Sequence, residues 1–112
     1  MGTRDADHGR AKAARNQALM REVNERIAEV SEEAWEVQFL CECADLSCEA
    51  VLDMSLLEYE SVRSSPVRFP ILAGHDLPRV ESVVEENERY AVVEKIGEAA
   101  EVSAQLDPRG RS

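Results

Sequence analysis

The hydrophobic positions of the N-terminal third repeat with a helical period. Apolar side chains recur there at intervals of three and four positions: Leu19, Met20, Val23, Ile27, Val30 and Ala34. This spacing gathers them on one face of an α-helix, with charged residues on the opposite face. We predict a long amphipathic helix over residues 11–33. Its apolar stripe is expected to be covered by the domain, by a protein partner or by a second copy of the chain.

The hydrophobic period changes to two after residue 36. Val37, Phe39 and Cys41 alternate there with Gln38, Leu40 and Glu42. The run CEAVLDM at residues 48–54 is again typical of a strand, and the four residues ADLS join the two runs. We therefore predict a hairpin. Alternate residues of a strand point to the same face, so Cys41 and Cys43 project together and Cys48 lies across the hairpin beside them.

A short helix is predicted after the hairpin. Ser55 and Glu58 have the spacing of a capping box, in which each side chain bonds the backbone amide near the other. Pro66 ends the helix at or before Ser65, because the residue before a proline avoids the helical conformation. We expect this helix to pack through four residues: Leu56, Leu57, Tyr59 and Val62.

The remaining apolar runs predict short strands. The first run follows residue 66, and Pro70 confines it to a sheet edge because proline has no amide to donate. Residues 80–85 and 89–96 predict two more strands, although the spacing of the valines leaves a helix over residues 77–86 as an alternative. The predicted fold class is α+β, with a long N-terminal helix, a short capping-box helix and a small, mainly antiparallel sheet.

The chain length is appropriate for one domain. We place this domain at residues 11–106, with disordered tails at residues 1–10 and 107–112. The sequence contains no run of about 20 apolar residues and its N-terminus lacks the apolar core of a signal peptide. We therefore expect a cytoplasmic protein.

Charge is distributed unevenly along the 112 residues, whose formal net charge is −10. Residues 1–21 hold five basic and two acidic side chains, whereas the rest of the chain holds eight basic and 21 acidic ones. An acidic body repels a phosphate backbone, which argues against nucleic-acid binding. The exception is a factor that acts through the basic N-terminal segment alone, with Arg10, Lys12, Arg15 and Arg21.

All three cysteines fall within eight residues, at Cys41, Cys43 and Cys48. An odd number cannot all pair, and two cysteines separated by one residue make a strained disulfide. A chain of this size also has a thin core, which a metal cross-link would stabilise. We therefore predict a zinc site. A redox-active thiol cluster and ordinary buried cysteines are the alternatives.

Tetrahedral zinc needs a fourth ligand, and the chain has two histidines. His8 lies in the predicted tail, whereas His75 follows a predicted strand and a glycine that permits a tight turn. We select His75 and expect Asp76 or a backbone carbonyl to hold its other ring nitrogen. Other candidates for the fourth position are Glu42, Asp45, Glu49 and a water molecule.

Three thiolates and one imidazole close the coordination shell, whereas a catalytic zinc keeps an open position. The sequence also lacks the H-E-x-x-H, G-x-S-x-G and Gly-rich phosphate-loop motifs of common enzymes. We therefore expect a non-enzymatic, zinc-stabilised protein-interaction module with a regulatory role, whose acidic surface suits a basic partner. The alternatives are a thiol-based redox or metal sensor that uses the same cluster, and a nucleic-acid-associated factor.

Five segments together resemble a family of small bacterial proteins, of actinobacterial type, whose function is unassigned. They are NQALMREVNERI, FLCECADLSC, LLEYESVR, LAGHD and ERYAVVEKIGEAAEV, and they span about residues 16–108. In that family a Cys-Glu-Cys and a third Cys precede a Gly-His and a closing Tyr-Val-Val-Glu-Lys run. The resemblance implies that the cysteines belong with Gly74 and His75, and it implies no activity. Ala73 stands where a proline is expected before the Gly-His.

Overall fold

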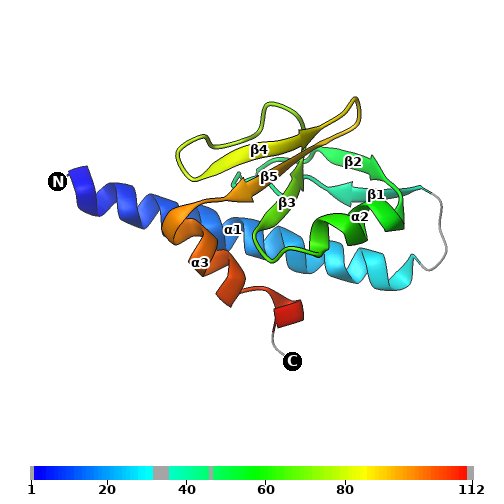
Figure 1. Cartoon of the computed structure of the whole chain (residues 1–112), viewed down its shortest axis with the longest axis horizontal. Helices are drawn as coiled ribbons and strands as arrows, with labels where there is room; N and C mark the ends of the chain where they lie inside the picture. The colour runs from blue at the N-terminus through cyan, green and yellow to red at the C-terminus, as the bar shows by residue number, and fades with distance from the viewer. Residues whose placement is uncertain (1, 32–35, 46, 111–112) are drawn as a thin grey trace.

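The computed structural model describes residues 2–31, 36–45 and 47–110, with side chains from Arg15 to Arg109. Within these ranges the chain forms three α-helices and two small antiparallel sheets, which confirms the α+β class (Figure 1). The helices are α1 (Gly2–Val30), α2 (Leu56–Arg63) and α3 (Gly97–Gln105), followed by a 3-10 turn at Pro108–Gly110. The strands are β1 (Val37–Leu40), β2 (Val51–Met54), β3 (Arg68–Ile71), β4 (Glu81–Glu86) and β5 (Ala91–Lys95).

Helix α1 runs along the long axis of the molecule beneath the strands, and α3 packs against it (Figure 1). None of the helices in these ranges combines the length and the apolar character needed to cross a lipid bilayer. The helix starts at Gly2 and ends at Val30, whereas the apolar spacing indicated residues 11–33. Ala34 and the side chains of residues 1–14, His8 among them, lie outside the described residues.

The β1–β2 hairpin forms around alternating apolar residues. Its strands pair antiparallel with Phe39 opposite Leu52, and both side chains are fully buried. Phe39 also stacks on Tyr59 of α2, with ring centroids 4.3 Å apart. Stacked aromatic pairs add about 1 kcal/mol beyond the burial of their surface. The hairpin and α2 therefore share one core.

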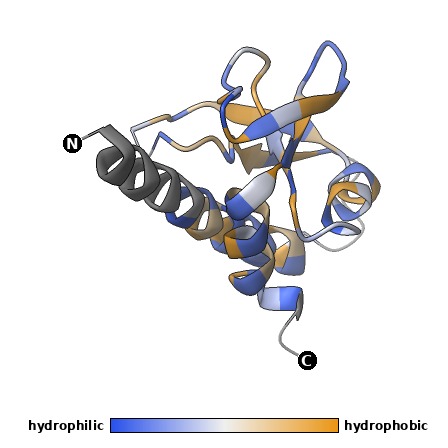
Figure 2. Ribbon diagram, turned by 60° about the vertical axis from the view of Figure 1, so that its left-hand side comes forward, coloured by the Kyte–Doolittle hydropathy of each residue, from blue (hydrophilic) through white to orange (hydrophobic). Residues whose placement is uncertain are grey.

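The second sheet has the strand order β3-β5-β4, which leaves β3 at an edge. This confirms the position predicted from Pro70, whose carbonyl accepts a hydrogen bond from the amide of Glu42. Residues 81–86 form strand β4, so the strand interpretation of this region is confirmed and the helical alternative is wrong. Figure 2 shows the hydrophobic residues concentrated along the strands, whereas the β4–β5 turn is hydrophilic.

A buried ion pair joins β4 to β5. Nζ of Lys95 lies 2.6 Å from Oε1 of Glu81, and both side chains are fully buried. Gln17 of α1 donates to Oε1 of Glu81 at 3.2 Å, and the amide of Leu77 donates to Oε2 at 2.9 Å. Because both carboxylate oxygens have partners, the charge is not left uncompensated in the core. The Gln17 contact also helps to fix α1 under the second sheet.

Helix α2 has the predicted capping box. The hydroxyl of Ser55 accepts from the amide of Glu58, and the carboxylate of Glu58 accepts from the amide of Ser55. Of the four packing residues, Tyr59 and Val62 are buried, whereas Leu57 is 83% exposed and was wrongly expected to pack. Eight residues make little more than two turns, so this helix buries only a narrow face.

Helix α1 turns a mainly polar face towards the domain, and the domain covers only part of the predicted apolar stripe: Ile27 packs against the core. Its buried side chains include four that recur at intervals of four, three and four residues: Gln17, Arg21, Asn24 and Ala28. Three apolar residues that we expected to be covered are exposed: Leu19 (52%), Val23 (40%) and Val30 (83%). Hydrogen bonds to other segments, rather than hydrophobicity alone, select the face of α1 that packs inward.

Arg21 has a fully buried guanidinium. Nη1 donates to the carbonyl oxygen of Pro66 at 2.7 Å, and Nη2 donates to that of Ser103 at 2.8 Å. The guanidinium also lies over the ring of Phe69, 4.6 Å from the centroid. Arg21 therefore joins α1 to α3 and to the segment before β3. The guanidinium is not accessible, so Arg21 cannot contribute to the alternative of a nucleic-acid-associated factor that acts through the N-terminal segment.

Contacts continue beyond residue 106, where the sequence placed the end of the domain. Asp107 is buried and forms an ion pair with Arg63 of α2. Arg109 pairs with Glu60 of α2 at 2.7 Å. Helix α3 was not predicted, although its run EAAEVSAQ is rich in good helix formers. These ion pairs attach the segment after α3 to the rest of the domain.

Replacing Arg21 with alanine should lower the free energy of unfolding by about 3 kcal/mol, because the carbonyls of Pro66 and Ser103 lose a charged donor. Arg26 is exposed on the same helix, so Arg26→Ala is the matched control and should change stability by less than about 0.5 kcal/mol. Chemical denaturation followed by circular dichroism measures both values. Similar losses for the two variants would contradict the structural role of Arg21.

Candidate metal centre

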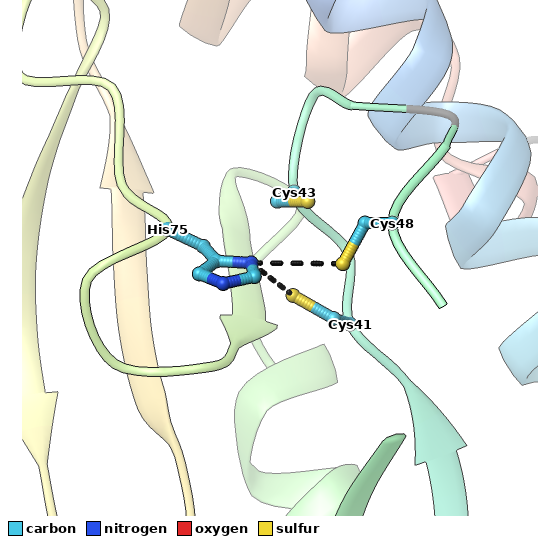
Figure 3. A group of neighbouring side chains, drawn as sticks. All are labelled: Cys41, Cys43, Cys48 and His75. Atoms are coloured by element: carbon cyan, nitrogen blue, oxygen red, sulfur yellow. Dashed lines mark hydrogen bonds between the residues drawn. The ribbon is translucent and has the colours of Figure 1, made fainter. Parts of the chain in front are cut away.

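The three cysteines and His75 converge from two loops that are distant in sequence (Figure 3). Cys41, Cys43 and Cys48 lie between β1 and β2, and His75 lies between β3 and β4. The structure thus brings together the four side chains that the sequence selected. It corrects their setting, because both strands of the hairpin stop short of the cysteines, which were predicted to lie on them.

The four potential ligand atoms form a compact group. The Sγ atoms and one imidazole nitrogen all lie within 4.8 Å of one another. Nδ1 of His75 is 3.6 Å from Sγ of Cys41 and 3.6 Å from Sγ of Cys48. In a tetrahedral zinc site of ordinary bond lengths, sulfur and nitrogen ligands are about 3.5 Å apart. The group therefore has dimensions that suit a tetrahedral metal ion bound through Nδ1.

Gly74 allows its loop to present the imidazole. Its φ of +91° lies in a region that residues with a side chain rarely adopt. The amide of His75 donates to the carbonyl of Leu72 at 3.0 Å, which closes a tight turn. Among the described residues, Nε2 has no hydrogen-bond partner, so the expected contact with Asp76 or a backbone carbonyl is not formed.

One side of the cluster is open to solvent. Cys41 and Cys43 are buried, whereas Cys48 and His75 are half-buried. A groove of about 440 Å³ borders the cluster and is lined by residues 43–45 and 74–77. Small solutes can therefore approach from the side of the imidazole.

The buried thiols have altered acidity. Burial raises the pKa of Cys41 to about 12, and it also raises the pKa of Cys43. The backbone amide of Leu72 donates to Sγ of Cys41 at 3.2 Å and opposes this shift. This donor comes from the β3–β4 loop. A bound cation would favour the thiolates, so metal binding would release protons and weaken as the pH falls.

Helix α1 holds the cysteine loop from behind. Asn24 binds both backbone groups of Leu40: its Nδ2 donates to the carbonyl at 2.9 Å, and its Oδ1 accepts from the amide at 2.8 Å. Nε2 of Gln17 donates to the carbonyl of Glu42 at 3.0 Å. The loop carbonyls at positions 40 and 42 therefore have side-chain amides of α1 as donors.

Asn16 extends this set of contacts, because its Nδ2 donates to the carbonyl of Ala44 at 3.0 Å. The carbonyls of positions 40, 42 and 44 all point towards α1, as alternate carbonyls of an extended chain do. Three side-chain amides thus replace the neighbouring strand that would otherwise bind them. We call Asn16, Gln17 and Asn24 the amide clamp. It fixes the backbone that carries Cys41 and Cys43.

Glu42 lies between Cys41 and Cys43 in the sequence, but its side chain contacts the amide clamp and is not part of the cysteine cluster. Its carboxylate is fully buried and accepts a hydrogen bond from Nδ2 of Asn24 at 2.7 Å. Burial raises the pKa of this carboxyl to about 8. Asp45, another candidate ligand, accepts bonds from the amide and hydroxyl of Ser47 at 2.9 and 2.6 Å. His75 is therefore the better candidate for the fourth position.

Sequence reasoning missed the amide clamp. Asparagine and glutamine within a helix are ordinary solvent-facing residues, and nothing local distinguishes these from others. Gln17 and Asn24 share a face with Arg21 and Ala28, and this face carries no apolar stripe. Asn16 lies on the neighbouring side of the helix, with Met20 and Ile27. Only the place of the cysteine loop in three dimensions reveals their role.

The fold and the site define a small α+β protein with a Cys3His group that can hold a metal ion. Comparisons with models of protein families, with curated proteins and with solved structures found no match to this chain. The resemblance to small bacterial proteins stays a prediction that rests on the five segments quoted above.

Replacing Asn24 with alanine should lower metal affinity by about tenfold, the low end of the cost of losing a ligand's own hydrogen-bond partner, because Asn24 bonds the backbone next to Cys41 rather than a ligand. Asn87→Ala is a matched control, since Asn87 accepts backbone bonds in the β4–β5 turn and lies outside the cluster. Competition with a chromophoric chelator measures the affinity of each variant for zinc. Unchanged affinity in Asn24→Ala would show that the clamp does not position the ligands.

Proposed function

We propose that this protein is a non-enzymatic, zinc-stabilised protein-interaction module with a regulatory role in the bacterial cytoplasm. The observation that carries the proposal is the Cys3His group, whose four ligand atoms lie within 4.8 Å of one another. The sequence resemblance supports the bacterial source, and the lack of a run of about 20 apolar residues in the sequence supports the proposed compartment. The chemistry of the four ligands supports zinc.

Zinc is the metal that the donor set favours. Three thiolates and one imidazole are soft and intermediate ligands, and a tetrahedral group of this composition is typical of structural zinc. Calcium and magnesium prefer oxygen ligands, which the cluster does not offer. With four protein ligands the coordination shell is full, so zinc would stabilise the fold rather than activate a water molecule.

The protein surface supports a role in binding. The formal net charge of −10 favours association with a basic partner and would speed its encounter. The exposed apolar residues of α1 offer an additional contact surface. A regulatory role is consistent with a small module whose folding depends on metal.

A thiol-based sensor is a second candidate, supported by the groove beside the cluster. Cys48 and His75 are half-buried, and the groove borders Cys43 and His75, so an oxidant can approach the sulfur atoms. Zinc-bound thiolates remain nucleophilic, and their oxidation would release the metal. A role in nucleic-acid binding has less support. Of the basic residues of the N-terminal segment, the structure describes the side chains of Arg15 and Arg21, and Arg21 is buried whereas Arg15 is exposed.

The purified protein should contain one zinc per chain under reducing conditions and should lose secondary structure on strong chelation. His75→Ala should weaken zinc binding by more than the roughly 100-fold that loss of an outer-shell partner costs. His8→Ala is the matched control and should bind zinc like the unaltered chain. Elemental analysis and chelator competition provide both measurements. A protein without stoichiometric metal would remove the basis of the proposal.

Exposure to micromolar peroxide separates the structural role from the sensor. We expect slow zinc release, similar to that of a known structural zinc finger, because Cys41 and Cys43 are buried and Cys41 accepts an amide hydrogen bond. A colorimetric zinc indicator follows the release. Release many times faster than from the finger, reversed by reductant and zinc, would support the sensor instead.

A further inference from the structure

Helix α1 presents an apolar stripe to solvent. Leu19, Val23 and Val30 are 52%, 40% and 83% exposed, and they recur at intervals of four and seven residues. This spacing aligns them along one side of the helix, as in the contact seam of paired helices. We call these three residues the seam. Met20 and Ile27 are half-buried and lie between this seam and the domain. The seam is therefore continuous with the core at one flank.

The domain does not use this side of α1. Hydrogen bonds hold the helix through its opposite face, where Gln17, Arg21 and Asn24 are buried. A helix with polar residues inside and apolar residues outside reverses the usual amphipathic order. Each square ångström of apolar surface removed from water is worth about 25 cal/mol, so covering the seam is favourable.

The charged residues beside the seam indicate which kind of partner would cover it. Four exposed charged residues lie on the flank opposite Met20 and Ile27, and their signs alternate along the helix: Arg15, Glu22, Arg26 and Glu29. A strongly basic partner would gain from the acidic body of the protein but not from this balanced flank. A surface that carries its own complementary charges suits a second copy of itself.

We propose that α1 of two copies of this chain pairs in an antiparallel arrangement through Leu19, Val23 and Val30. This inference rests on the proposed protein-interaction function and names a partner for the α1 surface alone. A register that places Leu19 against Val30 of the second copy also places Val23 beside Arg26. The two-fold symmetry repeats each of these contacts, so the interface closes on itself as a dimer.

Charge complementarity selects the antiparallel orientation. In an antiparallel pair each flank meets the same flank of the second helix, which brings Glu22 near Arg26 twice. In a parallel pair the charged flank would meet the apolar flank that contains Met20 and Ile27. The antiparallel arrangement thus covers the apolar residues of the seam and also brings opposite charges together beside it.

Sedimentation equilibrium tests the pairing, and zinc content is measured on the same samples. The full chain should be a dimer, and Val23→Asp should make it monomeric. Leu57→Asp is the matched control, because Leu57 is 83% exposed on α2 and should leave the dimer intact. The charge reversal Glu22→Arg should raise the dimer dissociation constant about tenfold or more, and adding Arg26→Glu should restore it.

A monomeric full chain, or a dimer that neither Val23→Asp nor Glu22→Arg weakens, would overturn the pairing. Circular dichroism checks that the variants are folded. If Val23→Asp unfolds, the Glu22→Arg and Arg26→Glu substitutions decide the question, because both positions are exposed. A monomer with one zinc per chain would overturn the pairing and leave the zinc module in place. A seam-dependent dimer without zinc would support the pairing and overturn the metal proposal.

Discussion

The hydrogen bonds from Asn24 to the backbone of Leu40 are the contact on which the rest of the structure depends. They fix the point at which β1 ends and the cysteine loop begins. Because Asn24 is buried, its amide group would be costly to leave without partners, and Leu40 supplies both a donor and an acceptor. This requirement turns the polar face of α1 inward and sends its apolar seam outward.

Buried charged groups have the same requirement for polar partners as Asn24. Arg21, Glu81 and Lys95 are buried in a chain with a small core, and each has a polar partner on another element. Such groups gain little net stability over apolar ones, but they discriminate strongly between one arrangement and its alternatives. The orientation of α1 is thereby specified by hydrogen bonds, with limited hydrophobic burial to support it.

The cluster of Cys41, Cys43, Cys48 and His75 sits where the two sheets meet. Three of its side chains come from the loop of the first sheet and one from a loop of the second. A metal bound there would cross-link the sheets, and the amide of Leu72 already ties them together through Sγ of Cys41. The cluster can therefore act on the stability of the whole domain, while its open side stays accessible to solutes.

The sequence by itself determined the features that depend on neighbouring residues. The capping box at Ser55, the edge strand at Pro70 and the turn at Gly74 follow from local backbone chemistry, and the Cys3His set follows from the scarcity of other soft ligands. Tertiary structure alone decided which face of α1 is buried. Hydrophobic spacing favoured Leu19 and Val23, but backbone carbonyls of the cysteine segment take their donors from Gln17 and Asn24. Periodicity records apolar positions and cannot register a polar partner 16 or 25 residues away in sequence, which is why it could not identify the face that the domain buries.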